Sequence, residues 1–252
     1  MITAKIKETL ASGGACYGGW LYLGSPASAE LMGQVGFDFL IMEGEHGALD
    51  MSVMQAQLMA LNGSPAVPMM RVPWNDPVKV KVALDVGVKG IMFPMVNSGE
   101  EALKAVRACR YPPQGMRGIG PGRCTLYGLS TQDYLKTAND DLLIFVIVEH
   151  EQAVQNLEEI LSVPGIDGVF FGYADYAGSL GLTGQNNHPR VLEARSRVLE
   201  ATQRHGVASG HAARSPAQAQ ELRALGFRLI TLGSDAAFIM EGGRAALGAM
   251  RG

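Results

Sequence analysis

Charged side chains follow the apolar run 39–42, in the sequence FLIMEGEHG: Glu43, Glu45 and His46. A carboxylate near an imidazole can hold the ring in one tautomer and raise its basicity, which suits a general base. Arg71 ends the next apolar run, AVPMMRV, and its permanent charge could stabilise a developing enolate oxygen. The alternatives are a solvated loop with a surface histidine, and an arginine that only forms a structural ion pair.

Two further carboxylates also come just after apolar runs. Glu149 follows LLIFVIV, and Asp175 lies just past IDGVFFG, in the sequence FFGYADY. Such a pair could present oxygen ligands to Mg²⁺ or Mn²⁺, with water and substrate oxygens completing the coordination. His150 comes next in the chain, but adjacent strand residues point to opposite faces, so we do not expect it to share the ion. The alternative is that Glu149 is a strand-end charge paired with a lysine or arginine.

Covalent mechanisms find little support in this chain. A Schiff-base aldolase needs a lysine at the carboxyl end of a strand, and no lysine has that position. The seven lysines are Lys5, Lys7, Lys79, Lys81, Lys89, Lys104 and Lys136. The nucleophile-elbow sequence G-x-S-x-G is absent as well. Proton abstraction assisted by a metal therefore fits the candidate residues best.

The elements that must position these residues alternate between short apolar runs and longer helical patterns. Eight runs predict strands, at 17–23, 37–43, 66–72, 88–94, 142–149, 166–172, 207–211 and 227–233. Most are continuously apolar, as parallel strands are when helices cover both faces of the sheet.

Helix signals fill the segments between the strands. Asp76 before Pro77 predicts a helix start and Gly87 its end; Ser215 before Pro216 predicts another that ends at Gly226. Ser98 with Glu101 fits a capping box. The segments 189–205 and 234–251 have helical periodicity.

Eight strand–helix units in this length predict one (β/α)₈ barrel domain over residues 1–252. In such a barrel all the strand ends named above face one mouth, where active sites lie. A doubly wound open sheet is the alternative fold. No G-x-G-x-x-G opens a helix after the first strand, so a dinucleotide-binding role has no support.

The composition of the chain further limits the kinds of protein it can be. The 252-residue chain has a net charge of −3, which gives no reason to expect a nucleic-acid or membrane partner. Its three cysteines are widely spaced, which argues against disulfides and thiolate zinc sites. Neither a bilayer-spanning run nor a signal peptide is evident, so we expect a cytoplasmic enzyme.

Four stretches together resemble the HpcH/HpaI aldolase family of class II, metal-dependent pyruvate aldolases. They are LGSPASAELMGQVGFDFLIMEGEHGALD, RVPWNDPVKVKVALDVGVKGIMFPMV, ACRYPPQGMRGIGPGR and VPGIDGVFFGYADYAGSLG. The resemblance covers nearly the whole chain and implies a TIM barrel. It also implies a divalent metal (Mg²⁺, Mn²⁺ or Co²⁺) and, as substrates, a 2-oxoacid and an aldehyde.

The resemblance implies a role for each candidate residue. These roles are His46 as general base, Arg71 as the group that stabilises the enolate, Glu149 and Asp175 as metal ligands, Gly172, Ala174 and Asp175 as the carboxylate pocket, and Asp85 as an acid that raises the basicity of the histidine. Three positions depart from the family pattern. Glu43 stands where Asp is usual, Ile147 replaces a substrate-contacting Gln, and Tyr173 replaces a common Pro.

Asp85 gives an expectation of its own. It lies near the carboxyl end of the helix that starts at Asp76, and in a barrel that end points away from the mouth. We therefore expect Asp85 to act on a neighbouring subunit's site, although a surface acid is the simpler reading. This expectation requires a homo-oligomer, and the family resemblance implies a hexamer built as a trimer of dimers. We expect the C-terminal helix to take part in its packing.

The expected reaction is reversible aldol cleavage of a 4-hydroxy-2-oxoacid to pyruvate and an aldehyde, as in aromatic or sugar acid catabolism. The loop 115–125, with Arg117 and Arg123, is the candidate for contacting the aldehyde half. Oxaloacetate decarboxylation and citrate- or CoA-ester-lyase chemistry on the same scaffold are the alternatives, and a non-catalytic barrel is the alternative of another class.

Overall fold

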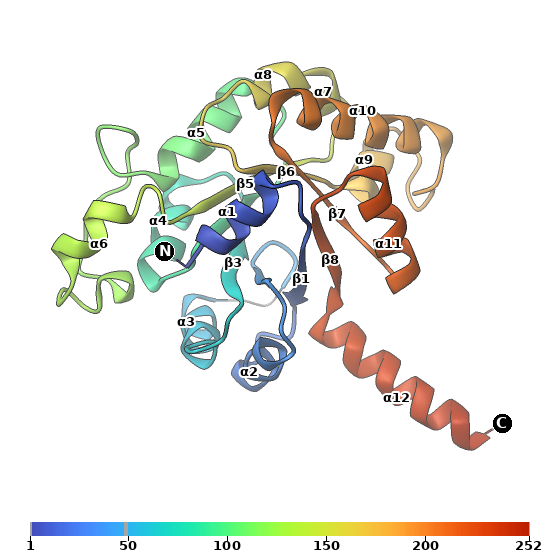
Figure 1. Cartoon of the computed structure of the whole chain (residues 1–252), viewed down its shortest axis with the longest axis horizontal. Coiled ribbons are helices and arrows are strands. Elements are labelled where there is room, and N and C mark those ends of the chain that lie inside the picture. The colour runs from blue at the N-terminus through green and yellow to red at the C-terminus, as the bar shows by residue number, and fades with distance from the viewer. Residues whose placement is uncertain (1, 48–49, 252) are drawn as a thin grey trace.

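The computed structural model describes residues 2–47 and 50–251 and shows a closed barrel of parallel strands in sequence order, with β8 paired to β1 (Figure 1). The strands are β1 (Cys16–Leu21), β2 (Phe39–Glu43), β3 (Val67–Arg71), β4 (Gly90–Phe93), β5 (Leu143–Val148), β6 (Gly168–Phe171), β7 (Ala208–Ala212) and β8 (Leu229–Ser234). Each overlaps a predicted run. The predicted barrel is confirmed, and the open doubly wound sheet is wrong.

Helices connect and cover the strands. They are α1 (Ala4–Ala11), α2 (Pro26–Gln34), α3 (Met51–Ala60), α4 (Pro77–Val86), α5 (Gly99–Cys109), α6 (Thr131–Thr137), α7 (Glu151–Gln155), α8 (Leu157–Leu161), α9 (Tyr173–Ser179), α10 (Pro189–His205), α11 (Pro216–Leu225) and α12 (Asp235–Arg251), with a 3₁₀ turn η1 (Arg123–Thr125). No helix in the described ranges combines the length and apolar character needed to cross a membrane.

Local capping explains where several helices begin and end. The Asp76 carboxylate accepts the Val78 N–H at 2.8 Å to start α4, and Gly87, at φ +112°, ends it. The predicted capping box at α5 is half right. Ser98 does accept the Glu101 N–H, but the Glu101 carboxylate accepts the Asn97 N–H at 2.6 Å instead of closing back on Ser98.

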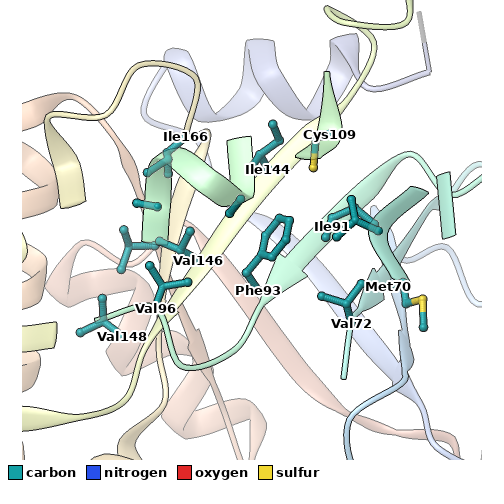
Figure 2. Close-up of a cluster of buried hydrophobic side chains, with 14 of the residues drawn as sticks. Met70, Val72, Ile91, Phe93, Val96, Cys109, Ile144, Val146, Val148 and Ile166 are labelled. Atoms are coloured by element: carbon teal, nitrogen blue, oxygen red, sulfur yellow. The ribbon is translucent and has the colours of Figure 1, made fainter. Parts of the chain in front are cut away.

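The core has two layers. Side chains from alternate strand positions, such as Phe145 and Ile147, fill the barrel interior, and Ile6 of α1 packs against this inner cluster. The other positions, such as Ile144 and Val146, point outward and pack beneath the helices (Figure 2). This alternation directs Ile147 toward the barrel axis, next to the carboxyl end of β5.

Helix α12 does not fold back over β8. It extends away from the barrel (Figure 1), and its side chains from Phe238 onward are exposed. Asp235 anchors its first turn, since its carboxylate accepts the Tyr22 N–H at 2.9 Å and the Ser28 hydroxyl at 2.6 Å. An apolar groove of about 980 Å³, which we call the α2–α11 groove, lies beside the root of α12 and is lined in part by Met32, Phe37 and Ala219.

Candidate active site

The carboxyl ends of the strands carry the predicted catalytic residues to one pocket of about 250 Å³. His46 after β2, Arg71 at the end of β3, Glu149 after β5 and Asp175 after β6 all line it. Barrel closure makes these positions neighbours, although up to 129 residues separate them in the chain (46 to 175). The sequence-based grouping of these four residues therefore corresponds to one surface.

A buried ion pair forms the floor of this site. Glu43 and Arg71 are register partners on β2 and β3. The Glu43 side chain is fully buried, and its Oε2 accepts the Arg71 Nε–H at 2.7 Å while Nη2 lies at 2.6 Å. Burial alone would lower the pKa of Arg71, but the charges of Glu43 and Glu45 outweigh it and raise that pKa. Arg71 thus keeps its charge, in a fixed orientation.

Aromatic rings complete the setting of the guanidinium. The Arg71 Cζ lies 4.9 Å from the centre of the Trp20 ring, and Nη2 lies 3.5 Å from the Tyr22 hydroxyl. A cation held against an aromatic face and two carboxylates has little freedom to turn. Arg71 can therefore present an N–H to a ligand oxygen without first reorganising.

The loop after β2 wraps around the other oxygen of Glu43. Oε1 accepts the N–H groups of Glu45 at 2.8 Å and His46 at 3.0 Å. Gly44 and Gly47 permit this tight turn, because a Cβ at Gly44 would meet the Arg71 carbonyl oxygen at 2.6 Å and one at Gly47 would collide with the Glu43 carbonyl oxygen. Glu43 therefore contacts the backbone of His46 and not its ring.

The carboxylate beside the imidazole is that of Glu45. Its Oε2 lies 3.5 Å from His46 Nε2 and 3.1 Å from Arg71 Nη1. Burial raises the pKa of Glu45, and repulsion by Glu43 and Asp175 adds to the rise. The His46 side chain is 58% exposed and borders the pocket, so it can reach a bound molecule. If His46 is a base assisted by a carboxylate, Glu45 is the carboxylate that this geometry places beside its ring.

Glu149 is the buried acid of the site, with 3% of its surface exposed. Burial raises its pKa to about 7, and repulsion by Glu45 and Asp175 contributes, while the Met95 N–H donated to Oε1 at 2.7 Å opposes the rise. Oε2 lies against Gly172, where a Cβ would come within 2.6 Å of it. One oxygen is therefore held by the backbone, and the other faces the start of α9.

Glu149 and Asp175 together suit a hard divalent cation. Two carboxylates border one pocket, and burial together with repulsion by neighbouring carboxylates raises the pKa of Glu149, an effect that a bound cation would offset. The described residues contain no cluster of three or more His, Cys, Asp or Glu side chains in metal-binding geometry. Two protein ligands are enough for Mg²⁺ or Mn²⁺, which keep water and substrate oxygens in their coordination sphere. His150 is not among the residues that line the pocket, and its Nδ1 accepts the Gln152 N–H and caps α7.

The sequence matches the family described as HpcH/HpaI aldolase/citrate lyase over residues 17–241. The chain belongs to this family. A 5-keto-4-deoxy-D-glucarate aldolase of Shigella dysenteriae is 39% identical over 92% of this chain and 90% of its own length. The family membership confirms the predicted enzyme class, an aldolase or aldehyde-lyase.

Solved structures of HpcH/HpaI proteins agree in fold. A family protein from Burkholderia cenocepacia is 38% identical and superposes with a TM-score of 0.95, covering 98% of this chain and 99% of its own. An HpcH/HpaI aldolase from Desulfitobacterium hafniense is 28% identical, with a TM-score of 0.89 over 98% and 96% of the two chains. The barrel fold is thus that of the solved HpcH/HpaI structures.

The structure places Asp85 away from the HpcH/HpaI site of its own chain. Its carboxylate accepts Arg117 Nη2 at 2.8 Å, and Arg117 in turn reaches the Tyr134 hydroxyl at 3.1 Å. Arg123 bonds to the Val86 carbonyl and to Asn62 Oδ1. Neither loop arginine lines the catalytic pocket of the same protomer, so their predicted contact with the aldehyde half has no support within one chain.

Sequence reasoning did not predict the contacts of several groups in and beside the pocket. Glu45 was visible in the EGEHG stretch, but its position beside both Arg71 and His46 depends on the turn. Trp20 and Tyr22 are aromatic residues spaced by two near the end of β1, a pattern that could have drawn attention. The N–H of Met95 was beyond reach, because it depends on a left-handed backbone, φ +53°, at a non-glycine residue.

Proposed function

We propose that this HpcH/HpaI enzyme cleaves a 4-hydroxy-2-oxoacid of the sugar-acid type, such as 5-keto-4-deoxy-D-glucarate, into pyruvate and a three-carbon aldehyde acid. The relatives named for this substrate suggest it. The observation that carries the proposal is the fixed Arg71 guanidinium, which shares a pocket with the imidazole of His46 and the carboxylates of Glu149 and Asp175.

Glu149 and Asp175 would hold a divalent ion, Mg²⁺, Mn²⁺ or Co²⁺. When bound, such an ion polarises the keto oxygen of the substrate and stabilises negative charge there. Asp175 lies in the first turn of α9, and Gly172, Ala174 and Asp175 all line the pocket, which places the backbone N–H groups of this turn beside it. These backbone groups are our candidates for receiving the substrate carboxylate.

The residues of the chain divide the remaining work. His46 removes the proton from the C4 hydroxyl, directly or through water, and the C3–C4 bond breaks to release the aldehyde. The bonding electrons remain on the three-carbon fragment as an enolate, whose charge Arg71 stabilises. A proton delivered to C3 then gives pyruvate. Glu43 is a positioning residue, because it holds Arg71 and the backbone of His46.

Oxaloacetate decarboxylation passes through the same enolate, and the family description also includes citrate lyases. These reactions remain the alternatives, and the substrate distinguishes them. One wall of the pocket limits how a substrate can bind. Ile147 presents an apolar wall beside Glu149, so hydroxyl groups of the acceptor must find partners elsewhere.

The projecting α12 supports an oligomer. Its exposed apolar residues, among them Ile239, Leu247 and Met250, have no cover in the protomer as described, and the α2–α11 groove is apolar. We propose that α12 packs on the α2–α11 region of a second copy, within a hexamer built as a trimer of dimers. We also propose that Asp85, which lies outside the pocket of its own chain, acts on the neighbouring subunit's site in this assembly.

Pyruvate release from 5-keto-4-deoxy-D-glucarate, coupled to lactate dehydrogenase, tests the proposed reaction. Each of Mg²⁺, Mn²⁺ and Co²⁺ should be compared with chelator. Arg71→Lys should lower kcat about 10²–10³-fold, the usual effect of removing one oxyanion-stabilising donor. Arg228→Lys, at the opposite end of the barrel, is the matched control and should keep the wild-type rate. Unchanged turnover in Arg71→Lys would rule out the assigned role.

A further inference from the structure

A second, smaller pocket lies behind the catalytic one, outside the ends of β6 and β7. It has a volume of about 130 Å³, and α10 and α11 close its outer side. Two guanidinium-bearing residues line it, Arg195 from α10 and Arg214 from the loop after β7. We call this space the Arg195–Arg214 pocket. No residue of the catalytic set His46, Arg71, Glu149 and Asp175 contributes to it.

The two arginines lack the acidic partners that their neighbours have. Arg190 on the same helix lies 3.1 Å from Glu151, but within residues 2–47 and 50–251 no carboxylate lies within 4 Å of Arg195 or Arg214. Arg214 instead donates its Nε–H to the Tyr173 hydroxyl at 3.2 Å, with its Cζ 5.3 Å from the centre of that ring. Two positive groups at one small cavity repel each other, and an anion between them would offset that repulsion.

The other polar groups of the pocket can donate hydrogen bonds. The Gln218 Oε1 is occupied by the Arg214 N–H at 2.7 Å, so its Nε2 is the group left to contact a ligand. The Asn186 Oδ1 is buried with no hydrogen-bond partner in the part of the chain that the structure describes, and a half-turn of this amide would present an N–H₂ in its place. The lining contains no Asp or Glu. The donors and charges together therefore favour an anion.

The aromatic wall of the pocket is uncharged. Burial, with a smaller contribution from the nearby charges of Arg195 and Arg214, lowers the pKa of His211 to about 4. The neutral ring donates from Nδ1 to the Ala212 carbonyl at 2.7 Å and stacks on Tyr173, with the ring centres 5.0 Å apart and an angle of 11° between the planes. His211 therefore fixes Tyr173 and leaves the arginines as the source of charge.

We propose that the Arg195–Arg214 pocket binds an oxyanion, a carboxylate or a phosphate group, with both guanidiniums as its main partners. Planar guanidinium groups pair with these anions through two parallel hydrogen bonds. The volume suits such a group, since it is about four times the ~30 Å³ that one water molecule occupies in the liquid.

Tyr173 connects this pocket to the catalytic one. Its side chain borders both pockets, and it is the first residue of α9, directly before Ala174 and Asp175. An anion that fixes Arg214 would also fix Tyr173 and the start of α9. The anion has two possible sources, the far carboxylate of the aldolase substrate or a free small anion. Only the first source rests on the proposed function.

Binding of inorganic phosphate to the purified, metal-free protein, followed by titration calorimetry, tests the site without any catalysis. Wild type should bind phosphate saturably, and Arg195→Gln and Arg214→Gln should each weaken the affinity about tenfold or more, since each removes a hydrogen bond to a charged group. Arg197→Gln, on the same helix but outside the pocket, is the matched control. Absence of saturable binding, or equal losses in all three variants, would overturn the proposal.

Steady-state kinetics then separate the two sources. If the far carboxylate of the substrate occupies the pocket, Arg195→Gln and Arg214→Gln raise KM for the diacid about tenfold and leave metal-dependent hydrogen exchange of pyruvate unchanged. If a free anion occupies it, KM stays the same, while added phosphate changes the wild-type rate but not that of Arg195→Gln. Phosphate binding with neither effect would support the site and refute its link to catalysis.

Discussion

Replacing Glu43 by Ala tests whether the buried ion pair holds the site together. The change removes the carboxylate that receives Arg71 at 2.7 Å and the N–H groups of Glu45 and His46. Arg71, 9% exposed, then has Glu45 as its one remaining carboxylate partner among the described residues. Removing one member of a buried ion pair typically costs about 3–5 kcal/mol, because the other charge stays buried without compensation.

The expected change in thermal stability is correspondingly large. For a protein of this size each 1 kcal/mol shifts the midpoint by about 2–4 °C, so Glu43→Ala should lower Tm by about 6–20 °C. Glu43→Gln should cost less, since its amide oxygen can still accept hydrogen bonds. Activity should fall in both, because the orientation of Arg71 and the backbone of His46 depend on the carboxylate.

The assay is unfolding followed by circular dichroism, with Glu158→Ala as the control. Glu158 also contacts two basic groups, those of Arg204 and His205, but on an exposed surface. Exposed pairs contribute little, so this change should leave Tm nearly unaltered. If Glu43→Ala costs no more than the Glu158 control, the buried pair does not stabilise the site and the reasoning fails.

Three further predictions follow from the same geometry. Metal affinity, measured by calorimetry, should rise about tenfold per pH unit below pH 7 and level off above it. The reason is the raised pKa of Glu149, about 7, since below that pH a proton must leave before the ion binds. A metal affinity that does not vary from pH 5 to 7 would contradict this prediction. Gly172→Ala should weaken metal binding, since its Cβ would displace Glu149 Oε2, whereas Gly178→Ala, at an exposed position of α9 with room for a Cβ, should not. A chain that ends at Ala237 should lose the oligomer in light-scattering measurements but keep its barrel, because α12 contributes little to the core; an unchanged assembly would refute the role of α12.

Much of this arrangement could be predicted from sequence because parallel strands put their carboxyl ends at one rim. Glu149 and Asp175 needed only the apolar runs before them and the closure of the barrel to be placed in one pocket. The helix boundaries at Pro77 and Gly87 followed from the fixed φ of proline and the left-handed φ available to glycine.

Other features depend on contacts that no local pattern encodes. Glu43 could have faced either the imidazole or Arg71, and the turn through Gly44 and Gly47 decides for Arg71. The periodicity of 234–251 predicts a helix but not its direction away from the barrel. Asp85 pairs with Arg117 across 32 residues, and the sequence showed the two only as separate charges.

The most direct test of the central claim, that these residues form an enolate-stabilising site, is deuterium incorporation into the methyl group of pyruvate in D₂O, followed by NMR. We predict exchange with Mg²⁺ or Mn²⁺, none with chelator, and loss of exchange in His46→Ala. His188→Ala, at the start of α10, serves as the control. Exchange that persists at the wild-type rate in His46→Ala, or its absence with every metal, would contradict this account of the site.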